Sequence, residues 1–123
     1  MYLLDTNAII YYSRGEQVVT EHVDHWLAMD QLLLTSTIVE AELFSWPNIS
    51  KRDIQKIDQM LETVAVIPVY SPIARAGAQL RRAYRIQLAD SLIAATAMIH
   101  HAALVTRNIK HFSRIKEVDL IAI

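Results

Sequence analysis

The sequence predicts an α/β domain with a mainly parallel central sheet and helices on both of its faces. Short apolar runs alternate with segments whose apolar residues recur at helical spacing, as in strand–helix–strand units. Glycine occurs only twice and proline three times, so tight turns are few and helices must fill most of the chain. A chain of 123 residues, 53% of them hydrophobic, buries one core, so we expect residues 1–123 to form a single domain.

In the first half of the chain, apolar runs end at polar residues that can begin a helix. Tyr2 to Leu4 is a short apolar run, and Thr6-Asn7 can cap a helix behind it. A second run ends at Thr35-Ser36, and Pro47 stops the helix that follows. The expected elements are a strand at 2–4, a helix from 6, a helix at 18–30, a strand at 32–34, a helix at 37–46 and a helix from 50.

The second half of the chain continues this alternation. Ser50 with Asp53 resembles a capping box, and Ser71-Pro72 resembles an N-cap with proline at the first helical position. Asp90 begins a helix of small and apolar residues. The expected elements are a buried strand at 65–69, a helix at 71–85, a helix from 89 or 90 to 101, a strand at 103–105 and an edge strand within 118–123.

Polar residues that directly follow the strands are the first candidates for a functional site, because open parallel sheets bind ligands at the carboxyl ends of their strands. These residues are Asp5, Thr6, Asn7, Ser36, Thr37, Thr106, Arg107 and Asn108. Asp5 can cap the next helix or face the crevice above the sheet, and the sequence leaves both roles open.

Two further acids extend this set. Glu42 shares a helix face with Ile38 and Val39, where an unpaired carboxylate is costly to bury. Asp90 at a helix N-terminus is favourable by about 0.3–1 kcal/mol, which is a structural explanation by itself. If Asp5, Glu42 and Asp90 converge, their oxygens suit a hard cation such as Mg²⁺ or Mn²⁺.

The net charge of −1 conceals two opposed halves of the chain. Residues 1–62 hold four Lys/Arg and ten Asp/Glu, which gives −6, whereas residues 63–123 hold eight and three, which gives +5. The basic residues near Asp90 and the last motif are Arg75, Arg81, Arg82, Arg85, Arg107, Lys110 and Arg114. This pattern favours an acidic site beside a basic surface, although scattered solvated charges explain it equally well.

Composition excludes several other classes of protein. Without cysteine there is no disulfide framework, thiolate zinc site or thiol nucleophile, which suits a reducing cytosol. His22 and His25 do not form an HExxH pattern, so a zinc hydrolase is disfavoured. No basic region precedes the first apolar residues, and the uncharged stretch from Ser91 to Val105 is too short for a bilayer span. We therefore expect a soluble, cytoplasmic protein with no membrane partner.

Four strings of the sequence resemble the successive motifs of PIN-domain ribonucleases. They are LLDTNAII at 3–10, TSTIVEAELFSW at 35–46, LADSLIAATA at 88–97 and LVTRNIKHF at 104–112. Their order and the length of the chain resemble the VapC-type toxins of bacterial toxin–antitoxin pairs, and the resemblance covers nearly the whole chain. It implies a PIN-like three-layer α/β/α domain with a mainly parallel sheet.

The same resemblance implies a Mg²⁺-dependent endoribonuclease toxin, with Mn²⁺ as the other suitable ion. It assigns catalysis and metal binding to Asp5, Glu42 and Asp90. The supporting polar residues that it assigns are Thr6, Asn7, Ser36, Thr106 and Asn108. It also implies an RNA substrate, a small cognate antitoxin that inserts a peptide near the site, and a homodimer. Asn108 stands where many members of the family have a fourth acid, so one ion is expected rather than two.

Some assignments stay open at this stage. Arg107 and Lys110 flank the expected crevice and are the preferred RNA-binding residues, with Arg85 as a further candidate. Arg81 and Arg82 could instead pair with an acidic tail of the antitoxin. The alternative function is a catalytically inactive PIN-like module that binds RNA or protein. A phosphotransferase with an aspartyl nucleophile fits poorly, because a D-x-D signature would need an acid at position 7.

Overall fold

The computed structural model describes all 123 residues. One five-stranded sheet in the order β3-β2-β1-β4-β5 forms its centre, and every pair of neighbouring strands is parallel. The strands are β1 (Tyr2–Leu4), β2 (Leu33–Ser36), β3 (Ala65–Ile67), β4 (Ala103–Thr106) and β5 (Leu120–Ala122). The helices are α1 (Thr6–Ser13), α2 (Gln17–Ala28), α3 (Thr37–Phe44), α4 (Lys51–Leu61), α5 (Ser71–Tyr84), α6 (Leu88–Ile99) and α7 (Ile109–Phe112).

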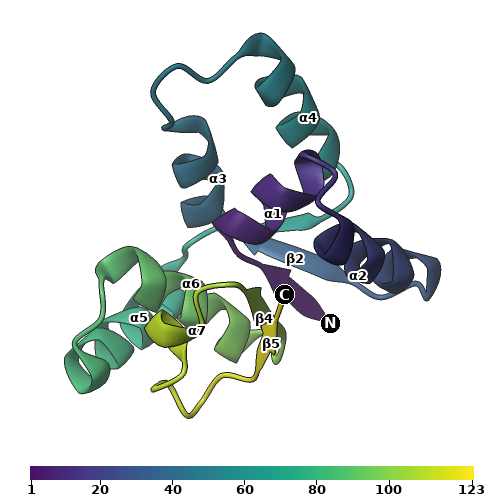
Figure 1. Ribbon diagram of the computed structural model, residues 1–123. Coiled ribbons are helices and arrows are strands. Elements are labelled where there is room, and N and C mark those ends of the chain that lie inside the picture. The colour runs from purple at the N-terminus through teal and green to yellow at the C-terminus, as the bar shows by residue number, and fades with distance from the viewer.

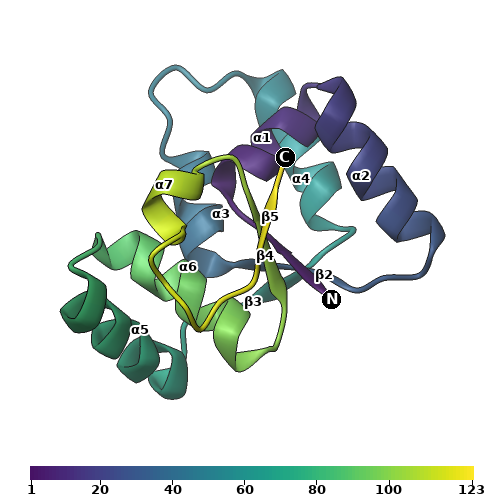
Figure 2. The same cartoon turned by 60° about the horizontal axis from the view of Figure 1, so that its bottom comes forward.

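Helices cover both faces of this sheet. Figures 1 and 2 show α1, α2 and α4 on one side of the strands, and α5 with α6 on the other. All-parallel sheets need this cover because the connection between two parallel strands crosses one face of the sheet. The predicted fold class is therefore confirmed. None of the helices combines the length and the apolar character that crossing a bilayer requires.

The depth of each strand follows from its place in the sheet. The central strand β1 carries Leu3 and Leu4, which are both fully buried. At one edge, β3 is only half buried and ends at Ile67, before Pro68, so the predicted buried strand at 65–69 is wrong in both burial and length. A strand at the edge has a neighbour on one side only, and proline supplies no N–H for a further ladder bond. The predicted strand at 118–123 is confirmed as the other edge strand, β5.

Most helix starts follow the predicted capping signals. The capping box is confirmed: the Ser50 hydroxyl accepts from the Asp53 N–H at 3.0 Å, and the Asp53 carboxylate accepts from the Ser50 N–H at 3.3 Å. The prediction for Ser71 is wrong by one position, because Ser71 and Pro72 are the first two helical residues and Tyr70 precedes them as the N-cap. Tyr70 makes no side-chain capping bond, so the fixed backbone of proline is the main local signal for this start.

The helix pair α5 and α6 packs closely at Gly77, which has no side chain to keep Leu92 away. A Cβ atom on Gly77 would lie 2.7 Å from Cδ2 of Leu92, which is closer than van der Waals contact. On α6, Ala94, Ala95 and Ala97 are fully buried. This packing fixes the first turn of α6, which carries Asp90.

Candidate active site

A cavity of about 340 Å³ lies where β1 and β4 end. Its lining residues are Asp5, Thr6, Asn7, Ile10, Glu42, Ser45, Trp46, Asp90, Ile93, Asn108 and Phe112. All three predicted metal-binding acids are among them, although they belong to the end of β1, to α3 and to α6. Of the supporting residues, Thr6, Asn7 and Asn108 also line this cavity.

Asp5 takes both of the roles that the sequence leaves open. Its Oδ1 accepts from the Ala8 N–H at 2.8 Å and so caps α1, while the side chain also lines the cavity. Burial raises the pKa of the Asp5 carboxyl, and the charges of Glu42 and Asp90 raise it further. Hydrogen bonds from Thr106 and Ala8 partly offset this rise in the pKa. Asp5 is therefore a carboxylate whose negative charge is unfavourable unless a cation balances it.

Glu42 is held by the first turn of α1. The Thr6 hydroxyl donates to Oε1 of Glu42 at 2.7 Å and so ties α1 to α3. Ser36 is buried and does not line the cavity: its hydroxyl accepts from the Ile38 N–H at 3.1 Å as the N-cap of α3. The structure thus places Ser36 as the residue that starts the helix on which Glu42 stands.

Thr106 is also placed behind the cavity wall. It is fully buried, bonds to Asp5, and its hydroxyl accepts from the Asn108 N–H at 2.9 Å. The Thr106 side chain thus connects the Asp5 carboxyl, which follows β1, with the backbone N–H of Asn108, which follows β4. Like Ser36, it positions residues of the cavity without lining it.

Asp90 has a partner that sequence reasoning did not include among the site residues. Its Oδ2 lies 3.2 Å from Nδ1 of His111, and the two residues line an adjoining cavity of about 220 Å³. His111 belongs to α7, a helix of four residues that is too short to leave a periodic pattern in the sequence. The available signal is the position of His111 inside the fourth motif, LVTRNIKHF.

The chemistry of the cavity fits a hard divalent cation. Its polar donors are carboxylate, amide and hydroxyl oxygens, which Mg²⁺ and Mn²⁺ prefer. No three acidic or histidine side chains come close enough together to form a complete ligand set. Mg²⁺ commonly keeps several waters and binds through one or two carboxylates, so these residues fit a hydrated ion better than an all-protein cage.

The predicted RNA-binding residues separate into two groups. Lys110 and Arg85 line the cavity that adjoins Asp90. Arg107 lines no cavity, and its guanidinium lies 3.4 Å from Glu16, donates to the Ile123 carbonyl at 2.9 Å and stacks 4.2 Å from the centre of the Tyr11 ring. The charge of Arg107 is thus already engaged by the protein itself.

Comparison with known proteins agrees with this architecture. Residues 2–118 match the family model described as PIN domain. The ribonuclease VapC19 of Mycobacterium tuberculosis is 30% identical over 117 residues, which cover 91% of this chain and 92% of that protein. The ribonuclease VapC2 of Rickettsia felis is 31% identical over 134 residues, which cover 98% and 96%.

Solved structures show the same likeness. The structure of VapBC2 from Rickettsia felis bound to a DNA fragment from its promoter aligns with a TM-score of 0.88 at 27% identity, over 99% of this chain and 98% of that one. VapBC-1 from nontypeable Haemophilus influenzae aligns with a TM-score of 0.80 at 28% identity, over 98% and 96%.

The chain belongs to the PIN-domain family, because the family model matches it along almost its whole length. Its all-parallel sheet with an acidic cavity at the carboxyl ends of the strands agrees with this class. Its curated relatives are the ribonucleases of the VapC type, as the four motifs predict. The resemblance stated from the sequence is thereby confirmed.

Proposed function

We propose that this chain is an endoribonuclease toxin that hydrolyses RNA phosphodiester bonds with a divalent cation held by Asp5, Glu42 and Asp90. The observation that carries the proposal is the single cavity into which three separate segments each bring one carboxylate. The ribonuclease names of its relatives support the reaction class. Asn108 adds an amide oxygen without charge, so we propose one ion.

Hydrolysis of a phosphodiester needs an activated water in line with the leaving oxygen and compensation for the charge that grows on the phosphoryl group. A bound Mg²⁺ or Mn²⁺ would supply both, as a Lewis acid that lowers the pKa of coordinated water. The protein supplies orientation: Ala8 and Thr106 fix Asp5, and Thr6 fixes Glu42. His111 fixes Asp90 from the rim of the cavity.

The antitoxin that we propose as a partner is supported by the structural relatives. Several of them are complexes of a VapC-type toxin with its antitoxin, including those of Rickettsia felis and Haemophilus influenzae. We propose that a small cognate antitoxin controls this chain, that RNA is its substrate, and that it forms a homodimer. An enzyme that cleaves cellular RNA acts in the cytoplasm, which is the location we propose.

RNA cleavage by antitoxin-free protein tests the proposal directly. We expect cleavage with Mg²⁺ or Mn²⁺, products with 5′-phosphate and 3′-hydroxyl ends, and none with EDTA. Asp5→Asn and Asp90→Asn should each lower the rate at least about 100-fold, because changing only a residue that hydrogen-bonds to a metal ligand typically costs about 10–100-fold. Asp58→Asn is the matched control, since Asp58 is exposed on α4 and lines no cavity.

Two outcomes would contradict this function. Cleavage that persists in EDTA, or in the Asp5→Asn variant, would show that the metal and its proposed ligands take no part in the reaction. RNA binding with neither cation binding nor cleavage would favour the inactive binding module, for which the uncharged Asn108 is the supporting observation.

A further inference from the structure

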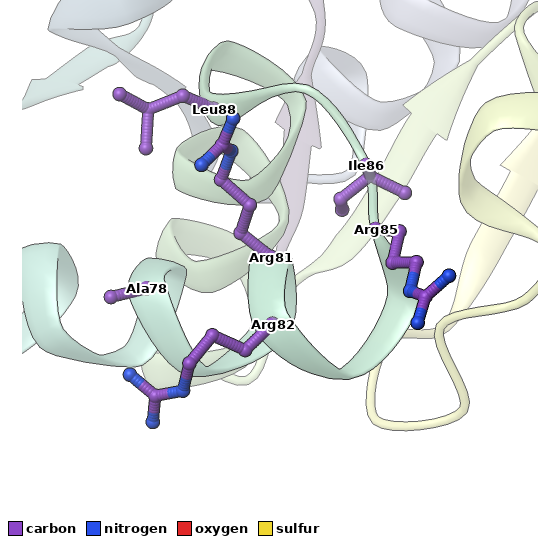
Figure 3. A pocket seen from close by; sticks show the side chains of 6 residues that line it. All are labelled: Ala78, Arg81, Arg82, Arg85, Ile86 and Leu88. Carbon is purple, nitrogen blue, oxygen red and sulfur yellow. The ribbon is translucent and has the colours of Figure 1, made fainter.

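The largest cavity of the molecule contains none of the three carboxylates. It measures about 460 Å³ and lies at the junction of α5 and α6. Its lining residues are Ala78, Arg81, Arg82, Arg85, Ile86 and Leu88. The cavity thus combines three arginine cations with three aliphatic side chains, and one of these, Leu88, is 53% exposed. Figure 3 shows these six side chains.

The three arginines of this cavity have no partner within the protein. None of them makes an ion pair or a side-chain hydrogen bond, since the only ion pairs are those of Arg107 and His111. By contrast, Arg114 donates to the Tyr84 carbonyl at the end of α5. Cations that lie close together and are not neutralised by the protein form a surface that attracts a polyanion.

The directions of the side chains indicate what kind of anion fits. In Figure 3 the three guanidinium groups point apart, with Arg82 and Arg85 extending to opposite sides of the helix end. A single compact anion would need donors that converge on one point. Separated guanidinium groups suit successive phosphates of an extended strand instead.

This cavity continues toward the acidic site. It shares Arg85 and Ile86 with the adjoining cavity of about 220 Å³, which Lys110 also lines. That second cavity in turn shares Asp90 with the acidic cavity. Asp90 is the only acid among the lining residues of the two basic cavities, so positive charge extends without interruption up to the proposed metal site.

We propose that these two cavities form a basic groove, made by Arg81, Arg82, Arg85 and Lys110, that binds the RNA backbone on one side of the scissile bond. The inference rests on the proposed function and adds the route by which the strand reaches the carboxylates. Phosphate contacts in the groove supply affinity and salt dependence, not sequence choice. The exposed face of Leu88 offers a base an apolar surface beside the arginines.

RNA binding in the absence of cleavage tests the groove. The Asp5→Asn protein in EDTA is titrated with a fluorescent single-stranded RNA of about 16 nucleotides, long enough to extend beyond the acidic cavity. Arg82→Glu and Arg85→Glu should each weaken binding at least about tenfold, the size of one lost hydrogen bond to a charged group. Each should also lower the slope of log affinity against log salt by about 1.

Arg75→Glu is the matched control. Arg75 lies on the same helix, is exposed, and changes the net charge equally, but it lines no cavity. Its effect should stay well below tenfold. Arg85→Gly is a second variant that protects the test against misfolding, because Arg85 has a left-handed backbone (φ 53°) that glycine adopts with less strain. Arg85→Gly should therefore keep or raise the Tm while it weakens RNA binding.

Cleavage kinetics distinguish the groove from the proposed function. With the carboxylates intact, the groove variants should raise KM by a larger factor for the long RNA than for a trinucleotide, which is too short to extend beyond the acidic cavity. If wild type neither binds nor cleaves RNA, the proposed function fails, and the groove with it. If wild type cleaves RNA and the groove variants behave like Arg75→Glu, the groove is wrong and the function stands. Unchanged RNA binding with a changed particle mass in light scattering would instead make this surface a contact between copies.

Discussion

At the scale of single residues, Asp5 has two tasks with opposite demands on its charge. As the N-cap of α1 it needs only an oxygen that accepts from Ala8. In the proposed role of metal ligand it needs a full negative charge, which burial and the neighbouring acids disfavour. The charge of Asp5 therefore lowers the stability of the fold at neutral pH, and a cation bound as we propose would relieve this cost.

The Asp5→Asn substitution separates these two tasks. Asparagine retains the acceptor for Ala8 and loses the charge, so the metal-free variant should have a higher Tm than wild type at pH 7 while its nuclease activity is lost. The raised pKa of Asp5 means that the native state binds this proton more readily than the unfolded state does. The stability advantage of the variant should therefore shrink as the pH falls through that pKa. Thermal unfolding in EDTA from pH 7 to pH 4 measures it, and a lower Tm for the variant across this range would contradict it.

Residue roles could be predicted only in part from the sequence. The sequence could name the three acids as candidates because each follows a strand or stands in a motif, and the structure brings all three to one cavity, while their role stays a prediction. The contacts that occupy the Arg107 guanidinium could not be predicted, because Glu16, Tyr11 and Ile123 are distant from it in sequence and contact it only in the folded structure. The importance of His111 was hidden for the same reason.

At the scale of secondary-structure elements, the pair α5 and α6 positions both Asp90 and the basic groove. Its close approach depends on the absence of a side chain at Gly77 opposite Leu92. Glycine in a helix interior costs about 0.5–1 kcal/mol relative to alanine, so the close packing compensates for a locally unfavourable residue.

Gly77→Val should separate these helices. Its Cβ would lie 2.7 Å from Cδ2 of Leu92, so the Leu92 side chain would have to move, whereas the 3.4 Å to Cα of Leu92 is ordinary van der Waals contact. We expect a loss of about 1–3 kcal/mol in the free energy of unfolding, measured by urea denaturation. Adding Leu92→Ala should recover part of it, because the two residues are in contact. Ala83→Val, at an exposed position of α5, should cost well under 1 kcal/mol. Strictly additive losses for the pair would refute a steric cause.

Element boundaries show where local signals suffice. The start of α4 could be predicted because its capping box is local, and its two hydrogen bonds are present. The half-buried state of β3 could not be predicted, because an apolar run of the same composition can form either a central strand or an edge strand. The helix α7 has four residues and no period, so only tertiary contact specifies it.

At the scale of the whole molecule, the parallel sheet is what assembles the site. Strands that all point in one direction place their carboxyl ends along one edge, so Asp5 and Asn108 become neighbours across 103 positions of the chain. The sequence predicted which edge would carry the site, since that rule needs only the strand type. It could not predict that no three acids stand close enough to form a finished ligand set, because that depends on side-chain positions.

Cation binding should therefore stabilise the whole fold. An ion that binds only the native state adds about 2.7 kcal/mol of stability at 100 times its Kd, and it also removes the repulsion among the three acids. The Tm of wild type should rise on addition of MgCl₂ or MnCl₂, whereas the same ionic strength of NaCl should leave it nearly unchanged. Asp90→Asn should weaken the rise, and an equal rise in Asp58→Asn and Asp90→Asn would show that the ion binds elsewhere.

The central place of β1 in the sheet affects the order in which the cavity forms during folding. Residues 2–4 form the middle strand, which pairs on one side with β2, a near neighbour in the chain, and on the other with β4, which is far along it. Until β4 pairs with β1, Leu3 and Leu4 lack one of their two neighbouring strands, and the segment after β4 does not yet bring Asn108 and Phe112 to the cavity. The pairing of β1 with β4 that completes the proposed nuclease site closes a loop spanning most of the 123 residues, so it is a contact of high sequence separation and is expected to form late in folding.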